Sequence, residues 1–444
     1  MIVSKFGGTS VGSFEAMQHS AEIIASNPNR RLIVISATSG TTNDLVTLAS
    51  AQLSSTAREE TIQKIELRHL AIIEKLESQD ETRVRFQKLL SELRQHLDFI
   101  GRDKRWKDAL FAFGELMSTS IFIQVLKEHG IDAQWLDART IIKTDSNFCH
   151  AEPDYNVISR KAKTLLSENV IYLTQGFIGS DIFGNTTTLG RGGSDFSASL
   201  FAEAVNADTL EIWTDVAGVF TTDPRLVKEA FPISQISFDE AAELSVFGGK
   251  VLHPATLKPA IRSGAKVRVL SSREPDLLGT TIVHKADTEP VVRAISVRKD
   301  QTLLTIRSLK MLHQHGFLAR LFQTLAEHKI SVDLVTTSEV SVSLTLDTAS
   351  NASNKVELTV AVLNDLKKFC EVKVENELSL IAIIGNHLNA TKGVSGLLFN
   401  QLEDYNIRVV CHGSSSNNIC FLVQEADAED IVRKLHKTFI EDRN

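Results

Sequence analysis

The sequence predicts an α/β protein in two parts: a mostly parallel open sheet covered by helices, followed by two ferredoxin-like α+β modules. Three observations carry this prediction. Short apolar runs in the N-terminal part are followed by small-residue turns and then by helical periodicity. A long charged stretch with helical spacing interrupts this rhythm. The C-terminal part repeats itself at a constant offset of 77 residues, as Gly316 with Gly393 and Phe322 with Phe399 illustrate. Such self-similarity indicates duplication of one structural unit.

The apolar runs predict strands of a parallel sheet. Residues 1–6 and 31–37 each precede a turn rich in Gly, Ser and Thr, and helical periodicity follows at 13–26 and 43–53. Alternation of strand, small-residue loop and helix is typical of βαβ units, whose sheets are covered by helices on both faces. The same rhythm returns with strands expected at 169–178, 209–215 and 266–271.

The charged stretch predicts a helical subdomain at about 56–128, inserted into the sheet domain, because it has helical spacing and almost no glycine. Periodicity is lost again near 285–293, a segment that contains Pro290. We therefore expect a catalytic domain at 1–290, a linker, and a regulatory region at 294–444.

Each copy of the repeat reads as a βαββα unit, the first at about 303–370 and the second at about 380–440. One interpretation is a structural dimerisation module. The other is a ligand-responsive pair, since the loops 308–317 and 385–394 carry glycine and small polar residues before a helix. Backbone N–H groups at helix N-termini suit an amino-acid carboxylate.

Composition excludes several classes of protein. The chain has 444 residues, a hydrophobic fraction of 43%, a charged fraction of 23% and a net charge of -7. An acidic balance argues against a nucleic-acid-binding protein, which needs a basic surface. No apolar run approaches 18 residues, so we expect no membrane span. Four cysteines without CxxC spacing, and no leader pattern at the N-terminus, predict a cytoplasmic protein with reduced thiols.

The first candidate functional motif is KFGGTSVG at 5–12, between a predicted strand and a predicted helix. Gly7 and Gly8 allow a tight turn and close approach of a ligand. The helix N-terminus attracts phosphate oxygens, and Lys5 can place a charge on a transferring phosphoryl group. The motif is neither a Walker A loop nor a dinucleotide fingerprint. Two glycines after a strand are also compatible with an ordinary βα turn.

The second motif is TTTLGRGGSD at 186–195, which opens another helix. Arg191 among glycines can receive a carboxylate or phosphate in a bidentate manner. Asp195 in the first helical turn is either an acid favoured by the helix dipole or a group that organises Lys5 or a metal ion.

Two further motifs complete the set. WTDVAGVFTTDPR at 213–225 follows a predicted strand, where Phe220 can stack on an adenine and Arg225 can reach phosphates. FGGKVLHP at 247–254 places Lys250 beside two glycines, while His253 is expected to be structural. Glu115, on a predicted helix, can accept a substrate ammonium.

Glycine-flanked cations with few candidate bases indicate phosphoryl transfer, a reaction that depends on positioning and charge neutralisation. The three cations are Lys5, Arg191 and Lys250. The sequence shows neither a Ser-His-Asp arrangement nor paired carboxylates, the patterns that would indicate another reaction. No second His or Cys stands at zinc-ligand spacing, so no side-chain set is assigned to a metal.

These motifs resemble those of the aspartokinase family. KFGGTSVG, SATSGTTNDL at 36–45, FGELMST at 113–119, TTTLGRGGSD, WTDVAGVFTTDPR and FGGKVLHP occur in this order, and the likeness covers essentially the whole chain. MLHQHGFLARLF at 311–322 and ISVDLVTTSEVSVSLTLD at 330–347 resemble the lysine-sensitive class. The resemblance implies an amino-acid-kinase three-layer α/β/α sandwich followed by two intertwined ACT modules. It also implies a homodimer, or a dimer of dimers, formed through those modules.

The resemblance implies that ATP and Mg²⁺ serve phosphorylation of L-aspartate to 4-phospho-L-aspartate, the first step towards lysine, threonine and methionine, with L-lysine as feedback inhibitor. It assigns catalysis to Lys5, with Asp195 orienting it. The aspartate site implied is Thr42, Glu115, Arg191, Gly192, Gly193 and Ser194. The ATP site implied is Lys5, Gly7, Gly8, Thr214, Asp215, Phe220, Arg225, Lys250 and Val251. The lysine site implied is Met311, Gly316, Phe317, Leu318, Ser331, Val332, Asp333, Ser338 and Glu339.

Two positions depart from the family pattern. Phe220 stands where relatives often carry Tyr, so a hydroxyl contact to the nucleotide is missing, and Gln314 stands where lysine-sensitive relatives have Ser. Two other functions stay open at this point. One is a glutamate or acetylglutamate kinase of the same fold, and the other is an amino-acid-sensing regulator with an inert kinase half.

Overall fold

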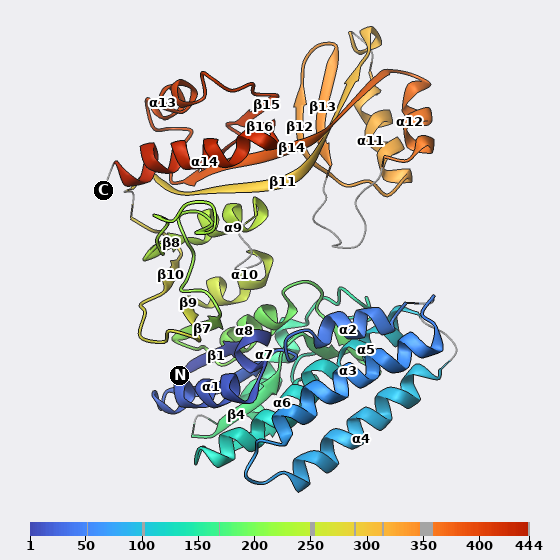
Figure 1. Cartoon of the computed structure of the whole chain (residues 1–444), viewed down its shortest axis with the longest axis vertical. Coiled ribbons are helices and arrows are strands. Elements are labelled where there is room, and N and C mark those ends of the chain that lie inside the picture. Colours follow the sequence, from blue (N-terminus) through green and yellow to red (C-terminus); the bar gives the residue numbers. More distant parts are fainter. Residues whose placement is uncertain are drawn as a thin grey trace. The chain divides into compact units, whose positions relative to one another are not determined.

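The computed structural model describes residues 1–50, 52–99, 103–167, 169–248, 254–287, 290–312, 315–346 and 358–442. The chain divides into two compact units (Figure 1). The first unit contains Met1–Val219, Pro232–Ala242 and Lys250–Ala286. The second contains Phe220–Phe231, Glu243–Gly249 and Asp287–Asn444. Each unit has its own sheet, and each is described separately here.

The first unit is built on a mostly parallel sheet with the order β3-β4-β2-β1-β7-β9-β10-β8 among the described residues. Within the described part of this sheet, only β9 and β10 pair in antiparallel fashion. The strands are β1 (Ile2–Phe6), β2 (Arg30–Ile35), β3 (Ala133–Leu136), β4 (Ile171–Gln175), β7 (Thr209–Thr214), β8 (Gln235–Ser237), β9 (Lys266–Ser271) and β10 (Thr280–Val283). The hairpin β5 (Ile178–Ser180) and β6 (Thr186–Thr188) forms a separate small sheet. The predicted strands at 1–6, 31–37, 209–215 and 266–271 are confirmed.

The strands are buried because helices cover the sheet, and the sequence shows this as continuous apolar runs rather than alternation. Val3 and Phe6 of β1 and Ile33 and Ile35 of β2 are fully buried. The helices of this unit outside the insertion are α1 (Phe14–Ala25), α2 (Thr41–Leu48), α7 (Tyr155–Leu165), α8 (Gly193–Ala204) and α10 (Pro254–Ser263), with the 3₁₀ turns η1 (Gly8–Val11) and η2 (Ala138–Thr140). Helix α9 (Phe238–Val246) begins in the first unit and ends in the second.

The predicted helical stretch consists of α3 (Ser55–Ile73), α4 (Asp80–Leu97), α5 (Lys104–Phe111) and α6 (Phe113–Glu128). Ser54 and Asp103 cap α3 and α5 by accepting hydrogen bonds from Ala57 N and Trp106 N. Helices α3, α4 and α6 run side by side (Figure 1), and their apolar faces join the core of the sheet. The insertion therefore shares one hydrophobic core with the kinase-like sheet.

Within the described residues, one stretch, Lys104–Glu128, is long and apolar enough by length and composition to cross a membrane. Its most apolar window is 78% buried inside the unit, as expected for a core helix. The packing of α5 and α6 inside the unit therefore explains why this stretch is apolar.

A buried ion pair ties three central strands together. Arg30 at the start of β2 lies 2.7 Å from Glu211 of β7, and the two side chains are 9% and 2% exposed. Ser4 Oγ of β1 and Trp213 Nε1 also donate hydrogen bonds to Glu211. Buried charges are tolerated when all their hydrogen-bonding groups are satisfied. This network fixes the register of β1 between its neighbours.

The second unit contains one continuous sheet with the order β12-β13-β11-β14-β16-β15. Its strands are β11 (Val292–Arg307), β12 (Val332–Thr337), β13 (Ser341–Leu346), β14 (Glu371–Gly385), β15 (Val409–His412) and β16 (Asn418–Gln424). Its helices are α11 (Phe317–Glu327), α12 (Val360–Lys367), α13 (Val394–Gln401) and α14 (Ala428–His436), with the short turns η3 (Leu309–Met311), η4 (Glu425–Asp427) and η5 (Lys437–Glu441).

The two repeats share their central strands. The second half of β11 pairs with the first half of β14 in the first module, Leu303 facing Glu375. The first half of β11 pairs with the second half of β14 in the second module, Ile295 facing Ile383. The predicted intertwined α+β modules are thus confirmed. Strands β11 and β14 are longer than the predicted segments 303–306 and 380–384. The first half of β14 completes the sheet of the first module, and the first half of β11 completes that of the second.

Irregularities mark the point where each long strand passes between modules. The pairing register of β11 with β14 shifts between Arg298 and Leu303. Asp300 and Glu377 adopt positive φ angles of 57° and 58°. A bulge of this kind bends and twists a strand. The bend lies where each strand passes from one module to the other within the single sheet.

Two segments that precede the linker belong to the second unit. Thr221 Oγ1 lies 2.9 Å from Nε2 of His436, which is fully buried and whose Nδ1 lies 2.6 Å from Glu441. Glu243 accepts hydrogen bonds of 2.6 Å from Ser415 Oγ and from Asn418 Nδ2. These contacts anchor the segments at 220–231 and 243–249 to the second module.

Candidate active site

A cavity of about 510 Å³ opens at the carboxyl ends of β1, β2 and β4. Ligands bind at this edge in open α/β sheets, next to the point where the strand order reverses. The reversal lies at β1, since β2 flanks it on one side and the later strand β7 on the other. Residues of the predicted site that line the cavity are Lys5, Gly8, Thr42, Glu115, Arg191, Gly192, Gly193, Ser194 and Asp195.

Lys5 and Asp195 form an ion pair inside this cavity. Lys5 Nζ lies 2.6 Å from Asp195 Oδ1, and the two side chains are only 11% and 13% exposed. Lys5 belongs to β1, whose neighbours on both sides fix it, and Asp195 lies in the first turn of α8. The structure therefore places a cation at a defined position within ion-pairing distance of a carboxylate.

Two helices direct their N-termini into the cavity. Helix α8 begins after Gly192, whose φ is 70°, and α2 begins after Gly40, whose φ is 86°. Neither cap residue supplies a side-chain hydrogen bond to its helix. The first turns of both helices thus present a positive dipole end to whatever the cavity binds. Arg191 is exposed and forms no ion pair with the residues that the structure describes.

Gly8 is required by close packing of two loops. A Cβ atom at Gly8 would lie 2.7 Å from the carbonyl oxygen of Ala37, closer than such atoms approach. The loop of Ala37 follows β2 and lines the same cavity with its small residues, which are Ser36, Ala37, Thr38, Ser39 and Gly40. Only Thr42 was predicted from this loop, although its run of small residues is a usable signal for a ligand-binding turn.

Glu115 lies at the base of the cavity, on the first turn of α6, and is 4% exposed. Burial raises the pKa of its carboxyl group to about 8, although the hydrogen bond from Ala37 N, at 3.2 Å, opposes the shift. At neutral pH the carboxyl group is therefore mostly protonated. A cation bound beside it would draw it into the charged form.

The raised pKa of Glu115 makes stability depend on pH. The carboxyl pKa is about 8 in the folded protein against an ordinary 4.5, so folding takes up a proton between these values. The free energy of unfolding should fall as pH rises from 4.5 to 8, by at most about 1.4 kcal/mol per pH unit. Glu115→Gln should weaken this decline, measured as thermal stability at about pH 6 and pH 8.

The matched control is Glu81→Gln, which changes an exposed carboxylate on α4 and should leave the pH profile as it is. An unchanged pH profile in the Glu115→Gln protein would show that the buried carboxyl group titrates normally.

Four residues that sequence reasoning missed shape the cavity. Cys149, Phe177 and Thr188 line it. Asp108, which is fully buried, positions two of them, since it accepts hydrogen bonds of 2.9 Å from Cys149 N and Thr188 N. Burial, together with this carboxylate, raises the pKa of the Cys149 thiol to about 11, so the thiol stays protonated. Asp108 belonged to an apparently ordinary charged helix, and nothing in its local pattern marked it.

The predicted nucleotide-binding residues are dispersed in the structure. Thr214 ends β7, the strand beside β1, and Asp215 follows it, while Gly7 N donates a hydrogen bond of 3.1 Å to Trp213 O of that strand. These residues share the sheet edge that carries Lys5. Phe220 and Arg225 belong to the second unit, where Arg225 forms an exposed ion pair of 2.6 Å with Asp223. Lys250, Val251 and His253 lie outside the described residues.

The predicted effector residues fall into two groups within the first module. One group lies at the end of the module where α11 begins. It consists of Met311, Gly316, Phe317 and Leu318, which precede or begin α11, and of Ser338 and Glu339 in the turn after β12. Ser308 N donates a hydrogen bond to Val340 O at this same end. Ser331, Val332 and Asp333 lie at the opposite end of β12, roughly 16 Å away along the strand. Asp333 already forms an ion pair with Arg298. Gln314 lies outside the described residues.

Among the described residues, no group of three or more His, Cys, Asp or Glu side chains is placed to hold a metal ion. The cavity presents Lys5, Arg191 and the N-termini of α2 and α8, an arrangement that suits an anionic substrate.

The chain matches two family models and several characterised proteins. Residues 1–271 match the amino acid kinase family, and residues 304–358 and 381–439 match the ACT domain. The chain is 47% identical to lysine-sensitive aspartokinase 3 of Escherichia coli, with 99% of each chain covered. It is 37% identical to the chloroplastic aspartokinase 2 of Arabidopsis thaliana, with 99% of this chain and 84% of the relative covered.

Solved structures agree with these matches. The E. coli aspartokinase III complex with aspartate and ADP matches with a TM-score of 0.87 at 47% identity, covering 99% of this chain and 100% of the other. The complex of that enzyme with lysine and aspartate matches with a TM-score of 0.88, covering 99% of each chain. The Clostridium acetobutylicum aspartate kinase matches with a TM-score of 0.84 at 26% identity, covering 99% and 100%. With its amino-acid-kinase sheet, its ACT modules and these full-length matches, the chain belongs to the aspartokinase family.

Proposed function

We propose that this protein is an aspartate kinase, which transfers the γ-phosphoryl group of ATP to the side-chain carboxylate of L-aspartate and is inhibited by L-lysine. The observation that carries the proposal is one cavity that joins the Lys5–Asp195 ion pair, Arg191 and the buried Glu115. Its support is the full-length similarity to aspartokinases, one of which has been solved with aspartate and ADP.

In this proposal the cavity recognises both charged groups on the α-carbon of aspartate, the carboxylate and the ammonium. The Arg191 guanidinium receives the α-carboxylate in a bidentate manner. Glu115, ionised when the substrate ammonium arrives, accepts hydrogen bonds from it. Thr42 and Ser194, together with the backbone of Gly192 and Gly193, complete the aspartate site at the N-termini of α2 and α8. The side-chain carboxylate of the substrate is then directed towards Lys5.

The reaction needs no general base. An oxygen of the aspartate side-chain carboxylate forms a bond to the γ-phosphorus as the bond from that phosphorus to the β–γ bridging oxygen breaks. The products are 4-phospho-L-aspartate and ADP, and no proton is transferred, because the attacking carboxylate is already ionised at neutral pH. Lys5 neutralises charge on the moving phosphoryl group, Gly7 and Gly8 allow close approach, and Asp195 orients Lys5.

ATP is proposed to bind at the sheet edge that carries Lys5, Gly7 and Gly8, beside Thr214 and Asp215. Phe220, Arg225, Lys250 and Val251 stay predictions for the nucleotide site. The described residues lack a cage of metal-binding side chains, which fits Mg²⁺ entering as the MgATP complex, bound mainly by phosphate oxygens and water. The residues present thus suit a metal ion that arrives with the substrate.

The test is aspartate-dependent formation of acyl phosphate, trapped with hydroxylamine in the presence of MgATP. We expect hydroxamate with L-aspartate and little with L-glutamate or N-acetyl-L-glutamate. Equal activity on glutamate would overturn the aspartate assignment. Turnover at background level with every substrate would favour an inert amino-acid-sensing regulator.

Lysine inhibition is proposed to act through the first ACT module. The two groups of effector residues lie farther apart along β12 than one lysine molecule can span. They can serve one lysine only if two copies of the chain each contribute one group. This argument supports a homodimer formed through the ACT modules, and we place this dimer in the cytoplasm. Inhibition then requires lysine to bind one conformational state more tightly than another.

Glu339→Gln should relieve lysine inhibition. Glu339 is exposed in the turn after β12 and is proposed to bind an ammonium group of lysine. Loss of one charge-assisted hydrogen bond should raise the lysine concentration for half-inhibition about tenfold or more. The measurement is a lysine titration of the hydroxamate assay at fixed aspartate.

Glu327→Gln, at the other end of α11, is the control and should keep the wild-type lysine response. A Glu339→Gln enzyme inhibited as strongly as the wild type would move the effector site elsewhere.

A further inference from the structure

A second cavity of about 510 Å³ lies in the helical insertion of the first unit. No residue of the proposed active site lines it. Its walls come from α4, α5, α6, β3 and β6, and its lining comprises Arg85, Lys88, Leu89, Glu92, His96, Ala109, Ala112, Phe113, Leu116, Ser120, Trp135, Arg139 and Thr186. Its volume falls within the range of sites for small organic ligands.

This cavity and the candidate active site share a wall. Phe113, Leu116 and Ser120 of α6 line the second cavity, whereas Glu115 of the same helix lines the active site. Likewise, Thr186 of β6 lines the second cavity and Thr188 of the same strand lines the active site. A ligand in the second cavity would therefore touch the elements that carry the residues proposed to bind aspartate.

The lining has an aromatic and apolar side suited to a flat ring. Trp135, on β3, is 43% exposed, although a large aromatic side chain is usually covered. Phe113 lies opposite the ring of His96, with centroids 6.1 Å apart, and His96 stacks on Trp106 at 5.1 Å. Together with Leu89 and Leu116, these rings form a surface on which an aromatic ligand can lie.

The lining also carries an excess of positive charge. Arg85, Lys88 and Arg139 face one carboxylate of the lining, Glu92. Arg85 pairs with Glu81 at 3.2 Å and Lys88 with Glu92 at 4.0 Å, and both are exposed i,i+4 pairs of the kind that contributes little. The buried Nε of Arg85 has no hydrogen-bond partner among the described residues. Arg85 and Lys88 are therefore available to an anionic ligand.

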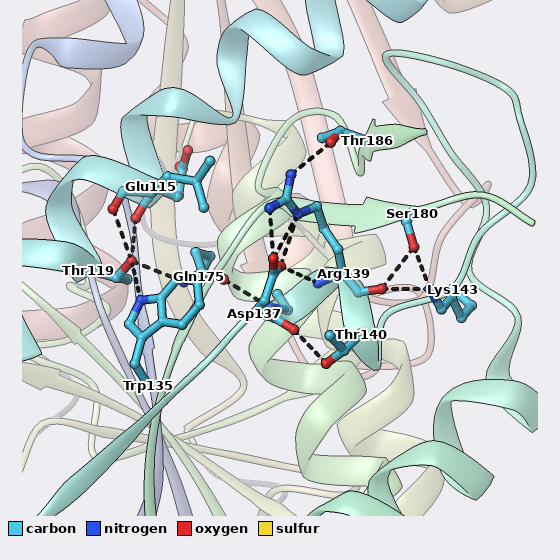
Figure 2. A network of polar contacts seen from close by, with 12 residues as sticks. Glu115, Thr119, Trp135, Asp137, Arg139, Thr140, Lys143, Gln175, Ser180 and Thr186 are labelled. Atoms are coloured by element: carbon cyan, nitrogen blue, oxygen red, sulfur yellow. Dashed lines mark hydrogen bonds and ion pairs between the residues drawn. The ribbon is translucent and has the colours of Figure 1, made fainter. Parts of the chain in front are cut away.

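Arg139 is held in place by its neighbours. Its guanidinium donates to both oxygens of Asp137, at 2.9 and 2.7 Å, and to Thr186 Oγ1 at 3.1 Å (Figure 2). Arg139 is thus a fixed part of the wall, whereas the more exposed cations, Arg85 and Lys88, come from α4.

We propose that this cavity is a second small-molecule site, which takes an aromatic carboxylate with its ring on Trp135 and its carboxylate on Arg85 and Lys88. The site is separate from the proposed aspartate, ATP and lysine sites.

Trp135 connects the site to the substrate wall. Its Nε1 donates a hydrogen bond of 3.2 Å to Thr119 Oγ1, which donates one of 2.7 Å to Glu115 O, and Gln175 Nε2 donates to the same hydroxyl at 3.0 Å (Figure 2). A ligand that moves the indole ring pulls on the backbone of Glu115. Occupancy of the site should therefore change the KM for aspartate, a consequence that rests on the proposed function.

The binding test does not depend on kinase activity. The probe is 5-fluoroindole-3-acetate, observed by ¹⁹F NMR with the full-length chain in the presence of saturating L-aspartate. We expect saturable binding of this anion, binding at least about tenfold weaker for uncharged 5-fluoroindole, and none for cationic 5-fluorotryptamine, since one lost charge-assisted contact is worth about that factor.

Variants of the lining residues test where the probe binds. Arg85→Gln combined with Lys88→Gln, and separately Trp135→Ala, should each raise the Kd about tenfold or more. Arg83→Gln is the matched control, because this arginine lies on the same helix with nearly the same exposure (40% against 42%) but outside the lining. Trp135→Phe keeps a ring without the N–H group, so it should bind the probe and yet lose the effect on the KM for aspartate.

The proposal is overturned if the probe shows no saturable binding up to about 5 mM, or if saturating aspartate abolishes its binding completely, as competition for one shared site requires. It is equally overturned if the Arg85/Lys88 double variant binds as the Arg83 control does. Failure of the hydroxamate assay with intact probe binding would instead remove the proposed kinase function and leave this site standing.

Discussion

Replacing Lys5 by alanine is expected to lower kcat for hydroxamate formation by about 10³-fold, the loss typical of removing one preorganised group that stabilises transition-state charge. The ammonium is fixed at the end of β1, 2.6 Å from Asp195 and only 11% exposed, so it cannot be replaced by water without loss of position. The KM for aspartate should change far less than kcat, because the substrate is held by other groups.

Two further variants separate catalysis from folding. Lys5→Met keeps the length of the side chain and should show the same loss with a normal thermal transition. Lys266→Ala changes an exposed lysine at the start of β9, at the opposite edge of the same sheet, and should leave kcat unaltered. An active Lys5→Met enzyme would contradict the central role given to this residue.

Arg191→Lys is expected to lower kcat/KM for aspartate by about 10²-fold, mainly through KM. Lysine keeps the charge and loses the planar fork that binds a carboxylate through two hydrogen bonds, each worth about 1.5–3 kcal/mol. Arg191 is exposed and pairs with no acid among the described residues, so folding should not suffer. The KM for ATP should stay close to that of the wild type.

Arg160→Lys, an exposed site on α7, is the control for a change of cation type. If the Arg191→Lys enzyme binds aspartate normally, the α-carboxylate is held elsewhere in the cavity. The helix N-termini at Gly40 and Gly192 would then be the candidates for that role.

Much of the catalytic half follows from the sequence because its signals are local. A strand that ends in glycines and continues into a helix places Lys5 at the sheet edge whatever the rest of the chain does. Arg191 and Asp195 were found in the same way, at the start of a second helix. Glu115 was predicted on a helix as an acceptor for a substrate ammonium, and its burial explains why its pKa departs so far from the ordinary value.

Contacts between distant segments could not be predicted. Asp108 joins Cys149 and Thr188 across 41 and 80 residues of sequence, and none of the three has an unusual neighbourhood in the chain. The sequence also gives no sign of the φ angle of 73° at Cys149, because a residue other than glycine seldom adopts such an angle. Such residues become visible only when the fold brings their segments together.

The extent of the regulatory strands was also hidden. Residues 371–377 alternate charged and apolar side chains over a few positions, which is compatible with a short strand, but nothing in the sequence tells which strand they pair with. Their pairing with β11 is a long-range contact that no local pattern reports. The intertwining was expected only because the motifs resembled a known family.

The sharing of β11 and β14 has a consequence for how this protein can be cut or grafted. A chain ending near residue 370 would retain Val292–Arg298 with no strand to pair them, because their partners are Leu380–Gly385. Exposed, apolar strand edges of this kind promote aggregation. Truncated proteins and chimeric sensors should therefore keep residues 292–442 together, and swapping a single repeat between homologues is expected to yield inclusion bodies.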